Sequence, residues 1–221
     1  MLNAVAVLFA VGACLVTGHW YRGRVDGLGR KVAYPTTWVG LLLVLAVLAG
    51  APGMLKAALE DRLSGVVSEV AGKSVRVRCQ GLGAAAIDTG SEYGYVQYKQ
   101  DGTPVTWTLI KRDQCNDLNA YLRSNKRNPG VKRVIAVHVL THEAMHLASI
   151  TNEAQAECAA VQRDALTARL LGASPQDAAA LARVYYALVY PRMDPDYKSS
   201  ECRLRGELDE GGDDAPWAAS A

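Results

Sequence analysis

The chain contains 221 residues, with 24 lysine and arginine and 22 aspartate and glutamate side chains, and a formal net charge of +2. Half of its residues are hydrophobic, which excludes a fully disordered chain and a collagen-like fibre. Positions 1–55 hold four basic residues and one acidic residue, so 20 basic and 21 acidic residues remain after position 55. A nucleic-acid-binding domain needs an excess of basic charge, and we therefore expect no nucleic-acid partner.

Two uncharged apolar runs near the N-terminus, residues 2–18 and 36–55, predict transmembrane helices. Each approaches or reaches the ~20 residues that a helix needs to cross the hydrocarbon core. Aromatic side chains, which suit the headgroup boundary, lie at the ends of these runs: His19, Trp20, Tyr21, Tyr34 and Trp38. We therefore expect residues 1–55 to form a transmembrane hairpin, in which Cys14 acts as a small apolar residue.

The loop between the two runs contains the four basic residues Arg22, Arg24, Arg30 and Lys31. Because basic loops stay in the cytoplasm, both termini are expected on the outer side of the membrane. Residues 56–221 would then be extracytoplasmic. We expect a folded domain over residues 56–205 and a disordered tail over residues 206–221, which are acidic and rich in glycine.

Four cysteines follow the apolar runs, an even number that fits disulfide formation in an oxidising compartment. They allow three pairings, and we favour Cys79–Cys115 and Cys158–Cys202, which each join positions close in the sequence. The rival interpretation is a metal site built from these cysteines, but no CxxC pair supports it.

The remaining patterns predict an α+β domain, in which a small sheet of a few strands packs on several helices. Residues 73–79, 93–99 and 105–110 alternate or are β-rich, and the last two runs form a predicted hairpin. Helices are predicted over residues 56–71, 113–124, 131–148, 152–172 and 174–190, the first as a continuation of the second apolar run.

The sequence His142-Glu143-Ala144-Met145-His146 lies within one of these predicted helices. Residues i and i+4 share a face of an α-helix, so both imidazoles can reach one Zn²⁺ while Glu143 stands beside them. His138 lies on the same face but about 12 Å along the axis from His146, too far to share a metal. We expect His138 to be a buried histidine that donates to a neighbouring carbonyl.

This motif, together with Glu153-Ala154-Gln155-Ala156-Glu157 downstream, resembles the HExxH zincin metallopeptidases of the gluzincin type. The resemblance implies a zincin-like domain and one Zn²⁺ per chain, bound by His142, His146 and Glu153. It further implies that Glu143 is the catalytic base and that Glu157 orients a ligand histidine. In an alternative arrangement, a helical hairpin that turns near Ile150 makes Glu157 the third ligand.

These features predict a membrane-anchored zinc metallopeptidase that hydrolyses peptide or protein substrates. The strands at residues 93–110 offer an edge that could align an extended peptide. The alternative function is a non-catalytic, membrane-tethered module that binds zinc or a partner on the same scaffold. Tyr185, Tyr186 and Tyr190 are either oxyanion donors or core aromatics, and their spacing on a helix favours core packing.

Overall fold

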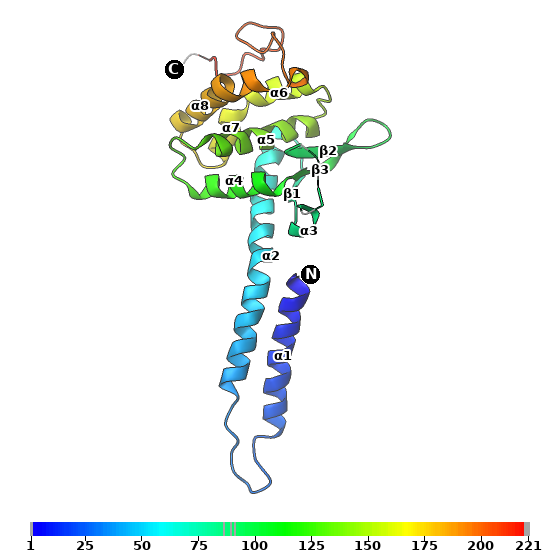
Figure 1. Cartoon of the computed structure of the whole chain (residues 1–221), viewed down its shortest axis with the longest axis vertical. Coiled ribbons are helices and arrows are strands. Elements are labelled where there is room, and N and C mark those ends of the chain that lie inside the picture. The colour runs from blue at the N-terminus through cyan, green and yellow to red at the C-terminus, as the bar shows by residue number, and fades with distance from the viewer. Residues whose placement is uncertain (1, 86, 89, 91, 219–221) are drawn as a thin grey trace. The chain divides into compact units, whose positions relative to one another are not determined.

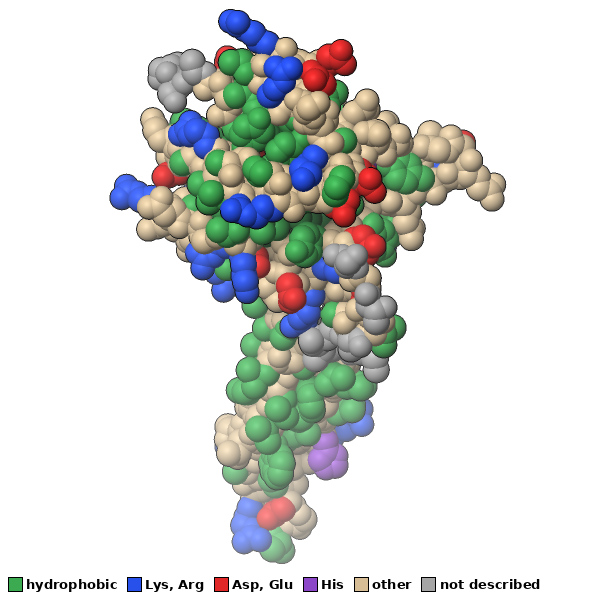
Figure 2. Space-filling model, turned by 45° about the horizontal axis from the view of Figure 1, so that its top comes forward, with side chains coloured by type: hydrophobic (Ala, Val, Ile, Leu, Met, Phe, Trp, Pro, Cys, Tyr) green, Lys and Arg blue, Asp and Glu red, His purple; other side chains and the backbone are tan. Residues whose placement is uncertain are grey.

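The computed structural model describes residues 2–85, 87, 88, 90 and 92–218, and the chain forms two compact units, residues 1–59 and 60–221. In the first unit, α1 (Leu2–Arg22) is followed by the first part of α2 (Thr36–Ala71). Both helices are long and apolar enough to cross a membrane. Hydrophobic side chains gather over this hairpin, with basic side chains at its turn (Figure 2). As expected, α2 continues unbroken through residues 56–71.

The second unit combines a small sheet with several helices, which agrees with the expected mixture of α and β structure. Its strands are β1 (Arg76–Cys79), β2 (Gly94–Tyr98) and β3 (Pro104–Ile110). Its α-helices after α2 are α3 (Leu82–Ala85), α4 (Arg112–Arg123), α5 (Val131–Leu147), α6 (Glu153–Val161), α7 (Asp164–Leu170) and α8 (Pro175–Val184). A π-helical turn (Tyr185–Val189) and two 3₁₀ turns (Tyr190–Arg192 and Pro195–Tyr197) follow α8.

The three strands form one sheet in the order β1-β3-β2. The predicted hairpin is present, because β2 runs antiparallel to β3 with Gly94 opposite Ile110. β1 runs parallel to β3, with Val77 opposite Thr108. β2 is therefore an edge strand, with no second strand partner among the described residues.

The outer edge of β1 is covered by the last turns of α2. Polar side chains spaced four residues apart on this helix accept hydrogen bonds from alternate backbone N–H groups of the segment that contains β1. Ser68 Oγ, Ser64 Oγ and Glu60 Oε1 accept from Val75, Val77 and Cys79 at 3.0, 2.8 and 2.7 Å. The helix thus satisfies backbone donors that a free sheet edge would leave unpaired.

α5 is the central element of the second unit (Figure 1). It contacts α4, α6, α7 and α8 as well as β2 and β3. Every side chain from Ala136 to Leu147 is buried. A helix that is mostly apolar around its circumference needs such surroundings, and here it carries the paired histidines into the interior.

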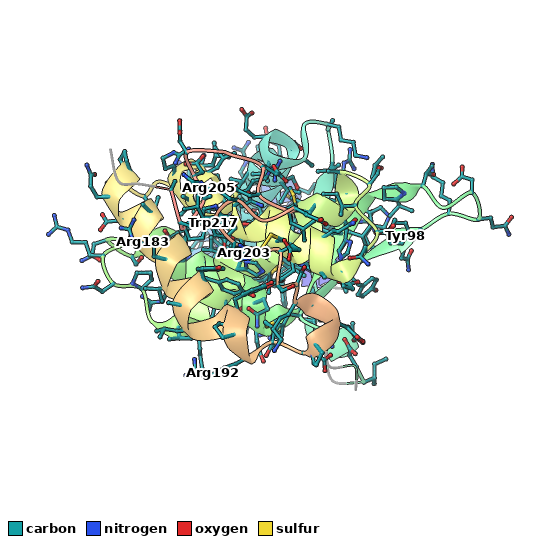
Figure 3. The ribbon with its side chains drawn as sticks, turned by 90° about the horizontal axis from the view of Figure 1, so that it is seen from above. Tyr98, Arg183, Arg192, Arg203, Arg205 and Trp217 are labelled. Carbon is teal, nitrogen blue, oxygen red and sulfur yellow. A yellow bond between two sulfur atoms is a disulfide. The ribbon has the colours of Figure 1, made fainter. Side chains whose placement is uncertain are left out.

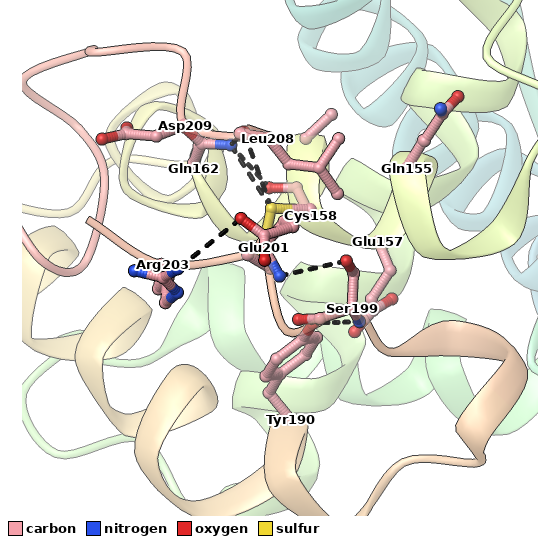
Figure 4. The surroundings of a disulfide bond; sticks show 12 residues. Gln155, Glu157, Cys158, Gln162, Tyr190, Ser199, Glu201, Arg203, Leu208 and Asp209 are labelled. Atoms are coloured by element: carbon pink, nitrogen blue, oxygen red, sulfur yellow. Dashed lines mark hydrogen bonds and ion pairs between the residues drawn. A yellow bond between two sulfur atoms is a disulfide. The ribbon is translucent and has the colours of Figure 1, made fainter. Parts of the chain in front are cut away.

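Both expected disulfides are present. Cys79–Cys115 joins the end of β1 to α4, and Cys158–Cys202 joins α6 to the segment after the last 3₁₀ turn (Figure 4). Cys14 is a free cysteine on α1. Paired cysteines are typical of proteins in oxidising compartments.

The C-terminal segment differs from the expected disordered tail, because its described residues 206–218 pack against the helices. Asp214 forms an ion pair with Arg169 of α7, and the Trp217 ring lies 5.2 Å from the Tyr186 ring, measured between centroids. Figure 3 shows Trp217 over the helices, whereas Tyr98 lies on the side of the sheet. The disulfide at Cys202 holds the start of the segment in place, so that its acidic side chains reach basic partners. Residues 219–221 lie outside the described residues.

This docking also explains why the helix predicted over residues 152–172 is two helices, α6 and α7. At the break, Gln162 Nε2 donates to the carbonyl of Leu208 at 2.9 Å, and its Oε1 accepts from the backbone N–H of Glu210 at 2.8 Å. No proline or glycine marks this position, so local sequence rules miss the break.

Candidate metal centre

Three side chains converge where α5 meets α6. His142 Nε2 and His146 Nε2 are 2.9 Å apart, and Glu153 Oε2 lies 3.2 Å from each of them. Ligand atoms about 2.0–2.1 Å from a tetrahedral zinc are separated by roughly 3.3 Å. The three atoms therefore lie at nearly the spacing that a single small metal ion imposes.

The second nitrogen of each imidazole fixes its tautomer. His146 Nδ1 donates to the carbonyl of Ile150 at 2.8 Å, because a carbonyl only accepts. His142 Nδ1 donates to the carboxylate of Glu157 at 3.0 Å. Both Nε2 atoms then present lone pairs to each other and to Glu153. With both imidazoles neutral, these three atoms are all acceptors, so either a further proton or a metal ion must lie among them. The group can hold a metal ion.

The connection between α5 and α6 brings Glu153 over the histidines. The chain reverses at Ser149, whose φ of 78° lies in the left-handed region. Asn152 then caps α6 by accepting from the backbone N–H of Gln155 at 3.0 Å. This short turn places Glu153, the first residue of α6, at the end of the α5 histidine face.

These partners also shape the electrostatics of the site. Burial opposes protonation of His142, but its hydrogen bonds to Glu153 and Glu157 outweigh this and raise its pKa to about 9. Hydrogen bonds from both histidines lower the pKa of Glu153 to about 2. The carboxylates therefore attract positive charge, either a proton or a metal ion, to the imidazoles.

Glu143 lies beside this group, under β2 and β3. Its side chain is only 4% exposed, and its Oε2 accepts from Thr108 Oγ1 of β3 at 3.1 Å. Burial raises the pKa of the Glu143 carboxyl. A carboxylate that takes up a proton more readily than usual is suited to general-base chemistry.

The absence of a side chain at Gly94 lets β2 pass close to Glu143. A Cβ atom at position 94 would lie 2.8 Å from Glu143 Oε1 and 3.1 Å from its Cδ. We expect Gly94→Ala to lower the free energy of unfolding by roughly 1–3 kcal/mol, the usual cost of overpacking a buried site. Urea denaturation of the full chain in detergent measures the effect. Gly81→Ala is the matched control, because nothing lies within 4 Å of its added Cβ. Equal stability of the two variants would contradict this prediction.

A cavity of about 500 Å³ opens over the group. It is lined by β2, by α5 and α6, and by the segment that contains the last 3₁₀ turn. Two tyrosines that the sequence did not single out lie here. Tyr98 of β2 has its hydroxyl 3.2 Å from His146 Nδ1, and the Tyr197 ring centroid is 5.8 Å from that of His142. Neither tyrosine belongs to a motif or a spacing that sequence analysis could have used.

Glu157 lies deeper, between two histidines. Its Oε2 is 3.0 Å from His142 Nδ1 and 2.9 Å from His138 Nε2. His138 is buried, as expected, but its partners are the carboxylates of Glu157 and Asp164 and not a carbonyl. The expectation missed this because Asp164 lies 26 residues away in the sequence. His138, His142 and Glu157 form a second group whose geometry could hold a metal ion.

The three tyrosines after α8 bond to other protein groups. Tyr185 is buried and donates to Glu157 Oε1 at 2.6 Å. Tyr186 and Tyr190 donate to the carbonyls of Cys202 and Ser199. These bonds favour the core interpretation over an oxyanion role.

Comparisons with protein-family models, with curated proteins and with solved structures found no match to this chain.

Proposed function

We propose that this chain is a membrane-anchored, zinc-dependent peptidase that binds one Zn²⁺ through His142, His146 and Glu153. The observation that carries the proposal is the convergence of two imidazole nitrogens and one carboxylate oxygen beside a buried carboxylate, at the floor of a cavity. Two histidines and one carboxylate form a donor set of catalytic zinc sites, which leave a further position for water.

A zinc ion held by His142, His146 and Glu153 would supply acidification of water and polarisation of a carbonyl group. In this proposal Glu143 accepts the proton of the attacking water and delivers it to the leaving amine. Its raised pKa favours uptake of the proton. Thr108 holds one oxygen of this carboxylate and so limits its rotation.

The edge strand β2 supplies a means of aligning a peptide. Gly94, Tyr95 and Val96 line the cavity, and the side of β2 away from β3 has no strand partner among the described residues. An extended peptide could add to this edge through main-chain hydrogen bonds. The proposed substrate is therefore an extended segment of a peptide or protein.

The second candidate is a non-catalytic module that holds zinc without hydrolysing a substrate. The observation in its favour is the burial of Glu143, which is 4% exposed and already hydrogen-bonded to Thr108. This alternative and the peptidase share the metal and differ in catalysis.

Zinc content tests the ligand set. Elemental analysis of the full chain in detergent should give one zinc per chain, and His146→Ala or Glu153→Ala should lose it, because two ligands hold the ion poorly. Glu157→Ala should weaken binding by about 10–100-fold, as expected for a group that orients a ligand histidine. The control is Glu69→Ala, at an exposed glutamate on α2. A wild-type chain without zinc would overturn the proposal. Loss of zinc in Glu157→Ala, with retention in Glu153→Ala, would reverse the ligand assignment.

The proposed location of the second unit is the outer side of the membrane. This location is supported by two helices with the length and composition of membrane spans, by the basic loop between them and by the two disulfides. Protease added to intact cells should therefore digest an epitope placed at the C-terminus. A tag inserted in the loop at residues 23–35 should resist until the membrane is opened with detergent. Protection of the C-terminal epitope would contradict this orientation.

A further inference from the structure

A chain of buried polar side chains extends from the candidate metal centre into the interior of the second unit. It runs from His142 through Glu157 to His138 and ends at Asp164 of α7. The last three side chains are 1%, 2% and 0% exposed, and each contact is 2.9–3.0 Å long. Carboxyl groups buried this completely need hydrogen-bond partners.

His138 is the partner that both carboxyl groups share. Its Nε2 faces Glu157 and its Nδ1 faces Asp164, each at 2.9 Å. A carboxylate only accepts hydrogen bonds, so Nε2 carries the proton that bonds to Glu157. Asp164 holds the other ring nitrogen and so fixes the orientation of the imidazole.

Tyr185 completes the surroundings of Glu157 and His138. It lies in the π-helical turn after α8, its hydroxyl donates to Glu157 Oε1 at 2.6 Å, and its ring stacks on His138 with centroids 3.5 Å apart. Single π-helical turns are frequent at functional sites. Glu157 thus accepts hydrogen bonds from His138, His142 and Tyr185. These three bonds fix the position of its carboxylate.

We propose that His138 is a positioning residue for the metal ligand His142. Its Nε2–H donates to the Glu157 oxygen that accepts the Nδ1 proton of His142, so Glu157 stays oriented toward His142 and His142 Nε2 stays free for the metal. Asp164 acts through His138 by holding its other nitrogen. This inference rests on the proposed function, because it assigns a role toward the same metal.

Zinc affinity tests the proposal. It is measured by competition with a chromophoric chelator, on the full chain in detergent. His138→Gln should weaken zinc binding by about 10–100-fold, the range found for groups that orient metal-bound histidines. Asp164→Asn should have a smaller effect. The double variant should bind zinc no more weakly than His138→Gln, because Asp164 acts only through His138. If the two residues had independent structural roles, their losses of zinc affinity would add. Tyr185→Phe keeps the stacked ring, removes one donor to Glu157, and should weaken binding less than His138→Gln. It remains informative if His138→Gln does not fold.

A second measurement does not need zinc. The chain has only four histidines, so ring ¹⁵N spectra of the histidine-labelled protein are simple to compare. At pH 8 the signals that disappear in His138→Gln should come from a ring that carries a proton on Nε2, the nitrogen that faces Glu157. A ring without a proton on Nε2 would overturn the proposal, as would wild-type zinc affinity in His138→Gln. Two zinc ions per wild-type chain, one of them lost in His138→Gln, would also overturn it and make His138 a ligand. If wild type binds no zinc at all, the proposed function itself fails.

Discussion

Replacing Glu143 with glutamine should leave the zinc content of the chain unchanged and lower its peptidase rate by about 10²–10⁴-fold, the usual contribution of a general base. Glutamine has nearly the same shape and can still bond to Thr108, which holds the carboxylate at 3.1 Å. Its amide cannot accept the proton of the attacking water. The variant therefore separates proton transfer from metal binding and from folding.

The measurement combines elemental analysis with cleavage of a mixed peptide library by wild type and variant. Glu69→Gln is the matched control, because Glu69 is an exposed glutamate on α2. Equal activity of Glu143→Gln and wild type would rule out Glu143 as the base. A wild-type chain that retains zinc but cleaves no peptide in the library would favour the non-catalytic module.

Removing the Cys158–Cys202 disulfide should lower the free energy of unfolding by ~2–4 kcal/mol, as expected for the loss of any such bond, and should also weaken zinc binding. Cys158 follows Glu157 directly in α6, and Cys202 begins the segment that docks on α6 and α7 (Figure 4). Between the helix and this cysteine, the chain forms the cavity wall that contains Met193 and Tyr197. Replacing both cysteines with serine should therefore release the C-terminal segment and weaken zinc binding as well as lower stability.

The matched control is removal of the Cys79–Cys115 disulfide, which joins β1 to α4. Neither of its cysteines is next to a candidate metal ligand in the sequence, and β2 is held at the cavity by its pairing with β3. We expect a similar loss of stability in urea denaturation, with zinc affinity close to that of wild type. Limited proteolysis should cut residues 203–218 in the Cys158/Cys202 variant only. Resistance of this segment in both variants would show that its ion pairs alone hold it.

The parts of the site that sequence analysis could predict depend on short-range geometry. His142 and His146 share a helix face because of their spacing, and the Asn152 cap follows a recognisable pattern. Asp164 and Tyr98 were not predictable in this way. Their contacts with His138 and His146 span 26 and 48 residues, and only the packing of α7 and β2 against α5 brings them together.

The same distinction applies to the fold. The β2–β3 hairpin follows from a local turn, whereas the parallel pairing of β1 depends on its contacts with α2. The break between α6 and α7 and the ordered C-terminal segment depend on each other through Gln162. Composition alone therefore suggested disorder in a segment that tertiary contacts hold in place.

The hydrogen bonds between α2 and β1 determine where a soluble fragment of the second unit must begin. A fragment starting at residue 72 would lack Leu63, Val66, Val67 and Val70, which are buried. It would also expose three backbone donors along β1, those of Val75, Val77 and Cys79. Exposed strand edges promote pairing between molecules, so such a fragment should aggregate. A fragment that starts before Glu60 keeps the three side-chain acceptors on α2. A protease that releases an intact second unit must likewise cut on the N-terminal side of Glu60.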